Sequence, residues 1–140
     1  KLDMLFYITG LAPREVYART QHSGSHVEIV ASVSALFDGD VTATIDFIGH
    51  AQYLGEDLQI HCERADLLLR HGSLWIGVNG TMQPLPIDEP ESTPVAAWLD
   101  TILNGAEERS PPEAALPVYD LTQAILTSGR TGMPVVVPSR

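Results

Sequence analysis

Apolar and polar residues alternate along much of residues 14–85, which is the spacing of β-strands. Turn-forming residues separate the alternating segments, and the clearest turn is Asp38-Gly39-Asp40. The pattern predicts strands over residues 14–20, 27–37, 41–47, 58–62, 67–70, 74–78 and 81–85. Because only Gly72-Ser73 and Asn79-Gly80 separate the later strands, we expect an antiparallel meander there.

The strands at residues 27–37 and 41–47 have one apolar face and one mostly polar face. The apolar face, expected to point into the core, carries Val27, Ile29, Ala31, Val33, Ala35, Phe37, Val41, Ala43, Ile45 and Phe47. The other face carries Ser32, Ser34, Thr42 and Thr44, with Val30 and Leu36 among them. A face of this kind suits water or a partner surface, so helices are expected to cover only the apolar face.

Helical spacing appears before and after these strands. A short helix with the stripe Leu2, Leu5, Phe6 and Thr9 is expected to end at Gly10. A second helix is expected from the N-cap Thr93 and Pro94 to Gly105, with the apolar stripe Val95, Trp98, Leu99, Ile102 and Leu103.

The last helix is expected to run from Pro111 or Pro112 to Ser128, either kinked at Pro117 or starting nearer to it. A short strand at residues 135–137 follows. The fold class predicted from these elements is α+β, with a mainly antiparallel, open-faced sheet and helices packed on one face.

Composition indicates one soluble globular domain that spans residues 1–140. The chain is 44% hydrophobic and 19% charged, and a domain of this size buries roughly two thirds of its unfolded surface. A formal net charge of −10 argues against nucleic acid and anionic membranes as partners. No apolar run approaches the ~18 residues that a membrane span requires.

The cysteine and histidine residues indicate no metal site. Cys62 is the only cysteine, so it forms no internal disulfide; we expect a buried thiol and a cytoplasmic location. His22 and His26 are four residues apart around Gly24, but no third ligand is near them in sequence. A solvated loop is therefore the preferred interpretation.

Motifs for cofactor binding and catalysis are missing from this chain. There is no Gly-x-Gly-x-x-Gly, no Gly-x-x-x-x-Gly-Lys-Ser/Thr and no Gly-x-Ser-x-Gly. The side chain of His61 would point away from Cys62 on a strand, so no nucleophile–base pair is evident. We predict that this chain contains no catalytic residue and no cofactor-binding residue, and that it does not bind NAD by itself.

The best candidates for ligand contacts are His50 and Tyr53. Both lie in the segment at residues 49–56, after a predicted strand, and loops at strand ends often supply polar side chains to a pocket. An ordinary polar loop is the alternative interpretation. Trp75 and Trp98 lie in periodic apolar segments and are expected to be packing residues.

Three segments together resemble the C-terminal domain of the glucose-fructose oxidoreductase / inositol dehydrogenase / MocA (Gfo/Idh/MocA) family. The tail carries Ala124-x-x-x-Ser128 and then Thr131-Gly132-Met133-Pro134-Val135. The other two are Asp3 to Gly10, followed by Glu15-Val16-Tyr17-Ala18, and the hairpin sequence Ala31 to Val41. The resemblance runs from Asp3 to about Pro138.

This resemblance implies a substrate-binding and oligomerisation domain that lacks the N-terminal nucleotide-binding domain of the family. The parent protein would then move hydride between a sugar or polyol and NAD or NADP, with residues of the sheet and its loops lining the substrate pocket. It would associate as a homodimer or larger homo-oligomer through the open sheet face. The alternative is a non-enzymatic dimerisation or small-ligand-binding module that shares only the sheet architecture.

The family's proton-transfer motif is represented here by one residue at most. Members use a Lys of the nucleotide domain and an Asp-x-x-x-His-x-x-Asp motif, whose last position corresponds to Asp3. The histidine would stand directly before Lys1, so Asp3 is predicted to be an accessory residue at the domain junction, or else a solvated first-turn acid. Where members show Tyr-Gly-Thr-x-Gly, this chain has His61 to Asp66 without either glycine, which puts a substrate contact there in doubt.

Overall fold

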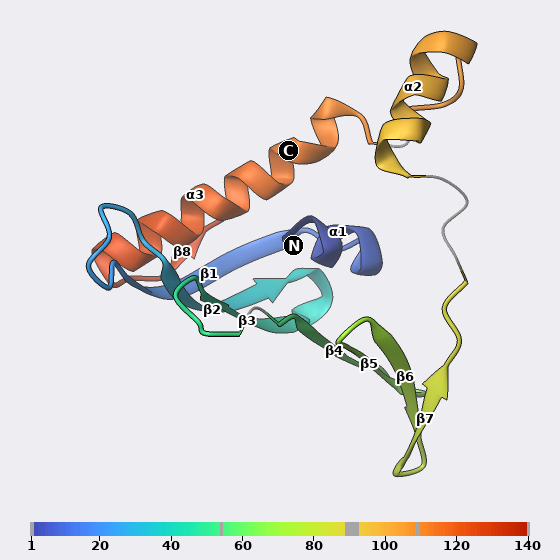
Figure 1. The fold of residues 1–140 in the computed structure, drawn as a ribbon. Helices are drawn as coiled ribbons and strands as arrows, with labels where there is room; N and C mark the ends of the chain where they lie inside the picture. Colours follow the sequence, from blue (N-terminus) through green and yellow to red (C-terminus); the bar gives the residue numbers. More distant parts are fainter. Residues whose placement is uncertain (1, 54, 89–92, 109, 140) are drawn as a thin grey trace. The chain divides into compact units, whose positions relative to one another are not determined.

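The computed structural model describes residues 2–53, 55–88, 93–108 and 110–139. These residues form two compact units: unit 1 is Lys1–His50 with Glu108–Arg140, and unit 2 is Ala51–Glu107. Each unit contains a four-stranded antiparallel sheet (Figure 1). The predicted α+β class with an antiparallel sheet is confirmed, and the predicted strands divide between two sheets.

The sheet of unit 1 has the strand order β3-β2-β1-β8. Its strands are β1 (Pro13–Gln21), β2 (Val30–Phe37), β3 (Thr42–Ile48) and β8 (Val135–Val136). The register pairs Ala18 with Val33 and Val33 with Ile45, so the predicted alternation places these three apolar side chains on one face.

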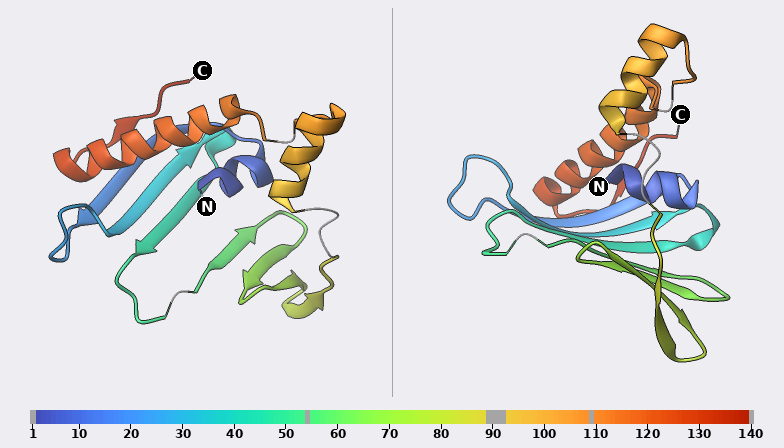
Figure 2. Two further views of the ribbon diagram at one scale, coloured as in Figure 1. Left: turned by 45° about the horizontal axis from the view of Figure 1, so that its top comes forward. Right: turned by 45° about the vertical axis from the view of Figure 1, so that its right-hand side comes forward.

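Two helices cover that face: α1 (Leu2–Thr9) and α3 (Ala115–Thr131). Both lie on the same side of the sheet of unit 1 in each view of Figure 2. The buried core consists of Val16, Ala18, Val33, Ala35, Phe37, Leu121, Ala124, Ile125 and Val137. At its edge the rings of Phe6 and Phe37 meet edge to face with centroids 6.4 Å apart, which anchors α1 to the sheet.

Two residues predicted to face the core are exposed instead. Val27 precedes the paired part of β2, which begins at Val30, so no neighbouring strand fixes its direction. Val41 follows the 3₁₀ turn Asp38–Asp40 that joins β2 to β3, and it precedes Thr42, the first residue of β3 that pairs with β2. The prediction of the turn itself is confirmed, with Gly39 at a φ of 71°.

The opposite face of this sheet is polar, as predicted. Ser32, Ser34, Thr42 and Thr44 are exposed, and Val30 and Leu36 are half-buried among them. Ser32 donates a hydrogen bond of 2.6 Å to Asp46 across the strands.

A buried serine links α3 to the sheet. Strand β8 pairs only with Glu15 and Val16 of β1, so it does not reach the amide of Ala18. That amide donates to Oγ of Ser128 at 2.9 Å, and the same hydroxyl donates to the carbonyl oxygen of Met133 at 2.7 Å. Ser128 therefore satisfies two backbone groups that the short strand leaves unpaired.

Helix α1 ends where the sequence predicts, whereas α3 continues past its predicted end at Ser128 to Thr131. Gly10 ends α1 at a φ of 65°, and its amide donates to the carbonyl of Phe6. Helix α3 starts at Ala115, after a 3₁₀ turn at Pro112–Ala114, so Pro117 lies in its first turn. The amides of the first turn have no partner within the helix, so a proline there breaks no bond and the alternative of a start near Pro117 is confirmed.

Unit 2 contains the predicted meander, with strand order β4-β5-β6-β7. Its strands are β4 (Asp57–His61), β5 (Asp66–Arg70), β6 (Ser73–Val78) and β7 (Thr81–Leu85). The predicted turn at Asn79-Gly80 is confirmed, with both residues at positive φ. The other turn is formed by His71-Gly72 rather than Gly72-Ser73, because Arg70 pairs with Ser73 and leaves these two residues between the strands.

The two faces of this second sheet differ strongly. The register places one aliphatic set on the same face: Leu58, Ile60, Leu67, Leu69, Leu74, Ile76, Val78 and Leu85. The other face carries the charged residues of the strands, including Asp57, Asp66 and Arg70, together with Leu68 and Trp75.

The third helix, α2 (Pro94–Asn104), also belongs to unit 2 and is confirmed as predicted. The hydroxyl of Thr93 accepts from the amide of Ala96, and Gly105 ends the helix at a φ of 69°. Trp98, predicted to be a packing residue, is exposed on this helix, so that prediction is wrong for the chain by itself.

Two general predictions have different outcomes. Within the described ranges, no helix is long and apolar enough to cross a membrane. The predicted burial of Cys62 is wrong: its thiol is exposed, because β4 ends at His61 and Cys62 lies in the following turn.

Candidate functional site

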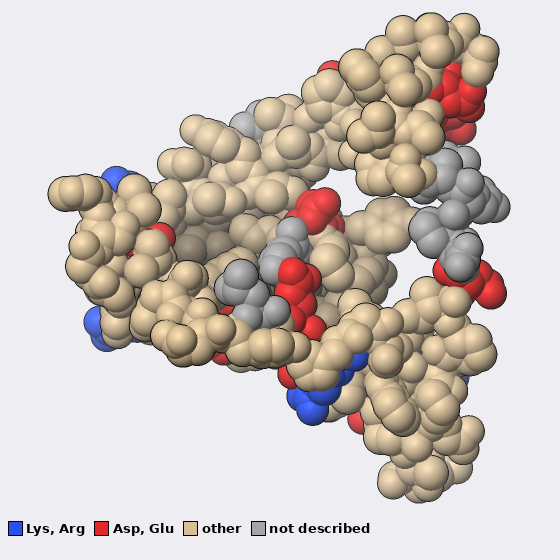
Figure 3. Space-filling view, viewed as in Figure 1, with Lys and Arg blue, Asp and Glu red and all other residues tan. Residues whose placement is uncertain are grey.

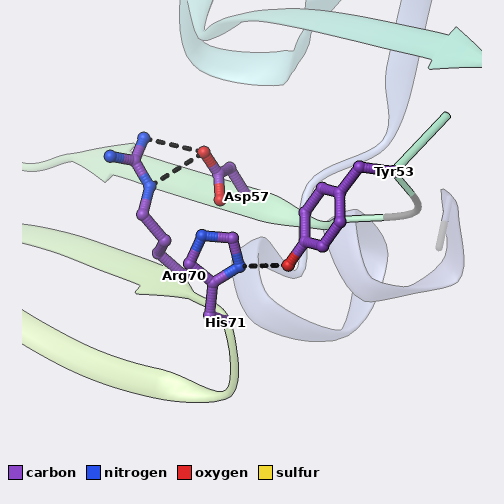
Figure 4. A network of polar contacts seen from close by, with 4 residues as sticks. All are labelled: Tyr53, Asp57, Arg70 and His71. Atoms are coloured by element: carbon purple, nitrogen blue, oxygen red, sulfur yellow. Dashed lines mark hydrogen bonds and ion pairs between the residues drawn. The ribbon is translucent and has the colours of Figure 1, made fainter. Parts of the chain in front are cut away.

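Tyr53 and His71 form the most defined polar contact near a predicted site residue (Figure 4). The phenol oxygen of Tyr53 lies 2.9 Å from Nδ1 of His71, and the two rings meet edge to face with centroids 5.7 Å apart. Tyr53 precedes β4, whereas His71 stands in the β5–β6 turn at a φ of 50°. Only the meander brings them together, since 18 positions separate them in sequence.

The positive φ of His71 shows why this turn holds its side chain in place. Residues other than glycine are uncommon in that region, and two-residue hairpin turns of type I′ require it at both central positions. His71 meets this requirement beside Gly72, which fixes the direction in which the imidazole leaves the backbone.

An ion pair lies beside this contact. Asp57 and Arg70 are cross-strand partners in β4 and β5. Nη2 of Arg70 lies 2.7 Å from Oδ2 of Asp57, and Nε donates to the same oxygen at 2.9 Å. Because both side chains are about half exposed, the pair contributes little stability, about 0–1 kcal/mol. Its evident effect is to orient the guanidinium next to His71 (Figure 4).

The side chains of Tyr53, Asp57, Arg70 and His71 are all exposed, and this cluster combines hydrogen-bond donors and acceptors (Figure 4). A phenol, an imidazole, a carboxylate and a guanidinium together can bind the paired hydroxyl groups of a sugar or polyol. Proton transfer is a separate requirement, and nothing in the cluster's geometry places one of these groups against a reacting atom.

The second predicted contact residue, His50, lies after β3 at the end of unit 1, and it is exposed. Tyr53 belongs to unit 2, so neither unit by itself contains both residues. A role for His50 and Tyr53 in substrate binding remains a prediction.

Asp3 lies in the first turn of α1 and is exposed. Its accessory role at the domain junction stays a prediction.

The β4–β5 turn borders a hollow of about 420 Å³. Its walls come from the β4–β5 and β6–β7 turns and include Cys62, Asp66, Asn79 and Met82. Nδ1 of His61 lies 3.0 Å from Oδ1 of Asp66, which holds that carboxylate in place. The hollow is polar, and neither Tyr53 nor His71 lines it.

A second hollow, of about 260 Å³, lies in unit 1 among Phe6, Leu11, Pro117 and Val137. The buried carboxyl of Asp120 lies at its wall. Sequence reasoning missed both Asp120 and His71. Asp120 directly precedes the core residue Leu121 on its helix, and this position could have indicated a buried acid. Nothing in the local sequence distinguishes His71 from an ordinary turn residue.

No group of three or more His, Cys, Asp or Glu side chains that could hold a metal ion occurs among the described residues. His22 and His26 lie in the loop between β1 and β2.

Comparisons with known proteins show the fold. No family model matches the chain, and a search of curated proteins gives no match. Solved structures do match, among them the aldose-aldose oxidoreductase of Caulobacter crescentus in complex with glycerol, with a TM-score of 0.81 and 20% identity. It is matched over 96% of this chain and 44% of its own.

Two further matches bear names of the same class. The UDP-N-acetylglucosamine 3-dehydrogenase of Acidithiobacillus ferrooxidans gives a TM-score of 0.83 at 12% identity, over 93% of this chain and 44% of its own. The WlbA dehydrogenase of Bordetella pertussis, solved with NADH and UDP-GlcNAcA, gives 0.76 at 18% identity, over 99% and 43%. This chain therefore has the fold of a part of these oxidoreductases and spans less than half of their length.

Proposed function

We propose that this chain is the C-terminal domain of an NAD(P)-dependent oxidoreductase of the Gfo/Idh/MocA type, which acts on a sugar-like or polyol substrate. The observation that carries the proposal is the fold match over nearly the whole of this chain but only 43–44% of each named oxidoreductase. A preceding nucleotide-binding domain accounts for the unmatched part. A cytoplasmic location belongs to the same proposal.

In this assignment the chain binds and orients substrate and does not catalyse by itself. The nicotinamide held by the preceding domain supplies the hydride chemistry. Tyr53 and His50 contribute hydrogen bonds to substrate hydroxyl groups, with His71 holding the phenol of Tyr53. Asp3 stands at the domain junction as an accessory carboxylate.

The gene of the parent protein tests this proposal directly. We expect a histidine immediately before Lys1, an aspartate four positions before that histidine, and a glycine-rich strand-turn-helix further upstream. The parent should reduce NAD or NADP with a sugar or polyol, measured by the absorbance of the reduced nicotinamide.

The 140-residue chain should show no saturable binding of NADH by calorimetry, because no segment offers a glycine-rich turn at a helix N-terminus. Micromolar binding to this chain, or another residue before Lys1, would favour the non-enzymatic module.

Tyr53 provides a test of the site. In the parent, Tyr53→Phe should raise KM by up to about tenfold and leave kcat nearly unchanged, because it removes one hydrogen-bonding hydroxyl from substrate binding. Tyr119→Phe is the matched control, since Tyr119 is also exposed and lies on α3. Equal kinetics for the two variants would remove Tyr53 from the substrate site.

Association is the third part of the proposal. Two copies are expected to pair through the open face of the unit 1 sheet, since twofold association buries one self-complementary patch. Light scattering at tens of micromolar, roughly where a standard interface is occupied, should give the mass of a dimer. Ser34→Lys, in the middle of that face, should shift the mass toward monomer, whereas Gln123→Lys on α3 should not. A wild-type monomer throughout this range would contradict the predicted interface.

A further inference from the structure

Helix α2 presents an exposed apolar stripe. Its five members, Val95, Trp98, Leu99, Ile102 and Leu103, are between 43% and 73% exposed. They follow the spacing i, i+3, i+4, i+7 and i+8, which places them on one side of the helix. In Figure 3 the visible surface of α2, at the upper right, is mostly uncharged.

The helix requires a partner on energetic grounds. It has 11 residues, and isolated helices shorter than ~12–15 residues are marginal in water. The caps at Thr93 and Gly105 satisfy backbone groups but bury no apolar surface. An exposed stripe of this size on a capped helix indicates a docking surface.

We propose that this stripe docks into an apolar groove of the preceding domain of the same polypeptide. Basic residues line the edge of that groove. The inference rests on the proposed function. More than half of each matched oxidoreductase has no counterpart in this chain, so a second body large enough to cover α2 is expected in the parent.

Charge favours that occupant over a second copy of this chain. Asp100 is exposed on this helix, which carries no basic residue. A copy of this chain carries 18 acidic against 8 basic residues, so charge repulsion would oppose its approach to this helix. A separate domain with lysine or arginine around its groove would complement Asp100. Binding of an amphipathic helix through i, i+3, i+4 and i+7 anchors is an established recognition mode.

Fluorescence and hydrogen exchange test the docking. Trp75→Phe leaves Trp98 as the only tryptophan of this chain, and any tryptophan of the preceding domain is replaced in the same way. We expect Trp98 emission typical of a water-exposed indole in the 140-residue chain and a shift to shorter wavelength in the parent. The amides of α2 should exchange at least ~100-fold more slowly in the parent, the factor that corresponds to about 2.7 kcal/mol of docking.

Two variants of the parent make the test specific to the stripe. Leu103→Gln places a polar side chain on the stripe, and Ala97→Gln places the same side chain on the opposite side of the helix. The first should restore fast exchange and long-wavelength emission, and the second should change neither. Equal effects of the two variants would show that the polar side chain acts on the helix itself and would overturn the proposal.

Other occupants give different results, each of which contradicts the proposal. Protection of α2 in the 140-residue chain that grows with concentration would identify a second copy. Protection independent of concentration would identify the aliphatic face of the β4-β5-β6-β7 sheet. Nicotinamide-dependent activity of the parent is measured separately: activity without α2 protection overturns only the docking, and protection without activity overturns only the proposed reaction.

Discussion

Leu121→Ala is expected to lower the free energy of unfolding by about 2–5 kcal/mol, the range for a leucine removed from a closed core. Leu121 is 0% exposed and is among the largest fully buried side chains of the core between α3 and the unit 1 sheet. Its removal loses the transfer free energy of three carbon atoms and leaves a cavity, because strands on one side and the helix backbone on the other cannot both move inward.

Urea unfolding followed by circular dichroism measures this loss. Leu116→Ala is the control, since Leu116 lies on the same helix and is 41% exposed. We expect it to cost less than about 1 kcal/mol, because much of its surface already contacts water. Similar losses for the two variants would mean that α3 does not pack on the sheet in the way the structure shows.

Ser128→Ala is expected to cost about 1–3 kcal/mol, although it removes a single oxygen atom. The buried amide of Ala18 would lose its partner, and so would the carbonyl of Met133, which is partly buried. The volume of the side chain hardly changes, so the cost reports hydrogen bonding and not packing.

Two measurements separate this effect from a general loss of stability. Ser34→Ala, on the exposed face of β2, should change the free energy of unfolding by less than about 0.5 kcal/mol. Native-state hydrogen exchange should show faster exchange at Ala18 in Ser128→Ala than at Val16, whose strand partners are unchanged. Uniform acceleration along β1 would contradict a local role for the serine.

The residues that carried the family resemblance are those on which the geometry of unit 1 depends. Ser128 supplies the buried hydroxyl, and Gly132 ends α3 at a φ of 67°. A Cβ on Gly129 would lie 2.5 Å from the hydroxyl oxygen of Thr20, so the close approach of α3 to β1 requires glycine there. The tail sequence is therefore explained by packing, and it indicates a fold more directly than it indicates an activity.

Much of the local structure was predictable from sequence. The alternation of Val33, Ala35 and Phe37 is a property of neighbouring residues, and so are the caps at Gly10 and Gly105. Signals of this kind depend on the backbone conformation of a few consecutive residues, which their own side chains control. The starts and ends of most elements and the core face of β2 were determined at this level.

Only the tertiary structure decided the division into two sheets, the exposure of Cys62 and Trp98, and the meeting of Tyr53 with His71. The residues of the Tyr53 contact are far apart in sequence and lie outside any shared periodic segment, so no local pattern predicts that contact. Burial likewise depends on which other element arrives to cover a surface: the stripe of α2 has the same spacing whether or not a partner is present. A sequence pattern specifies which side of an element is apolar, and the assembled chain determines what that side contacts.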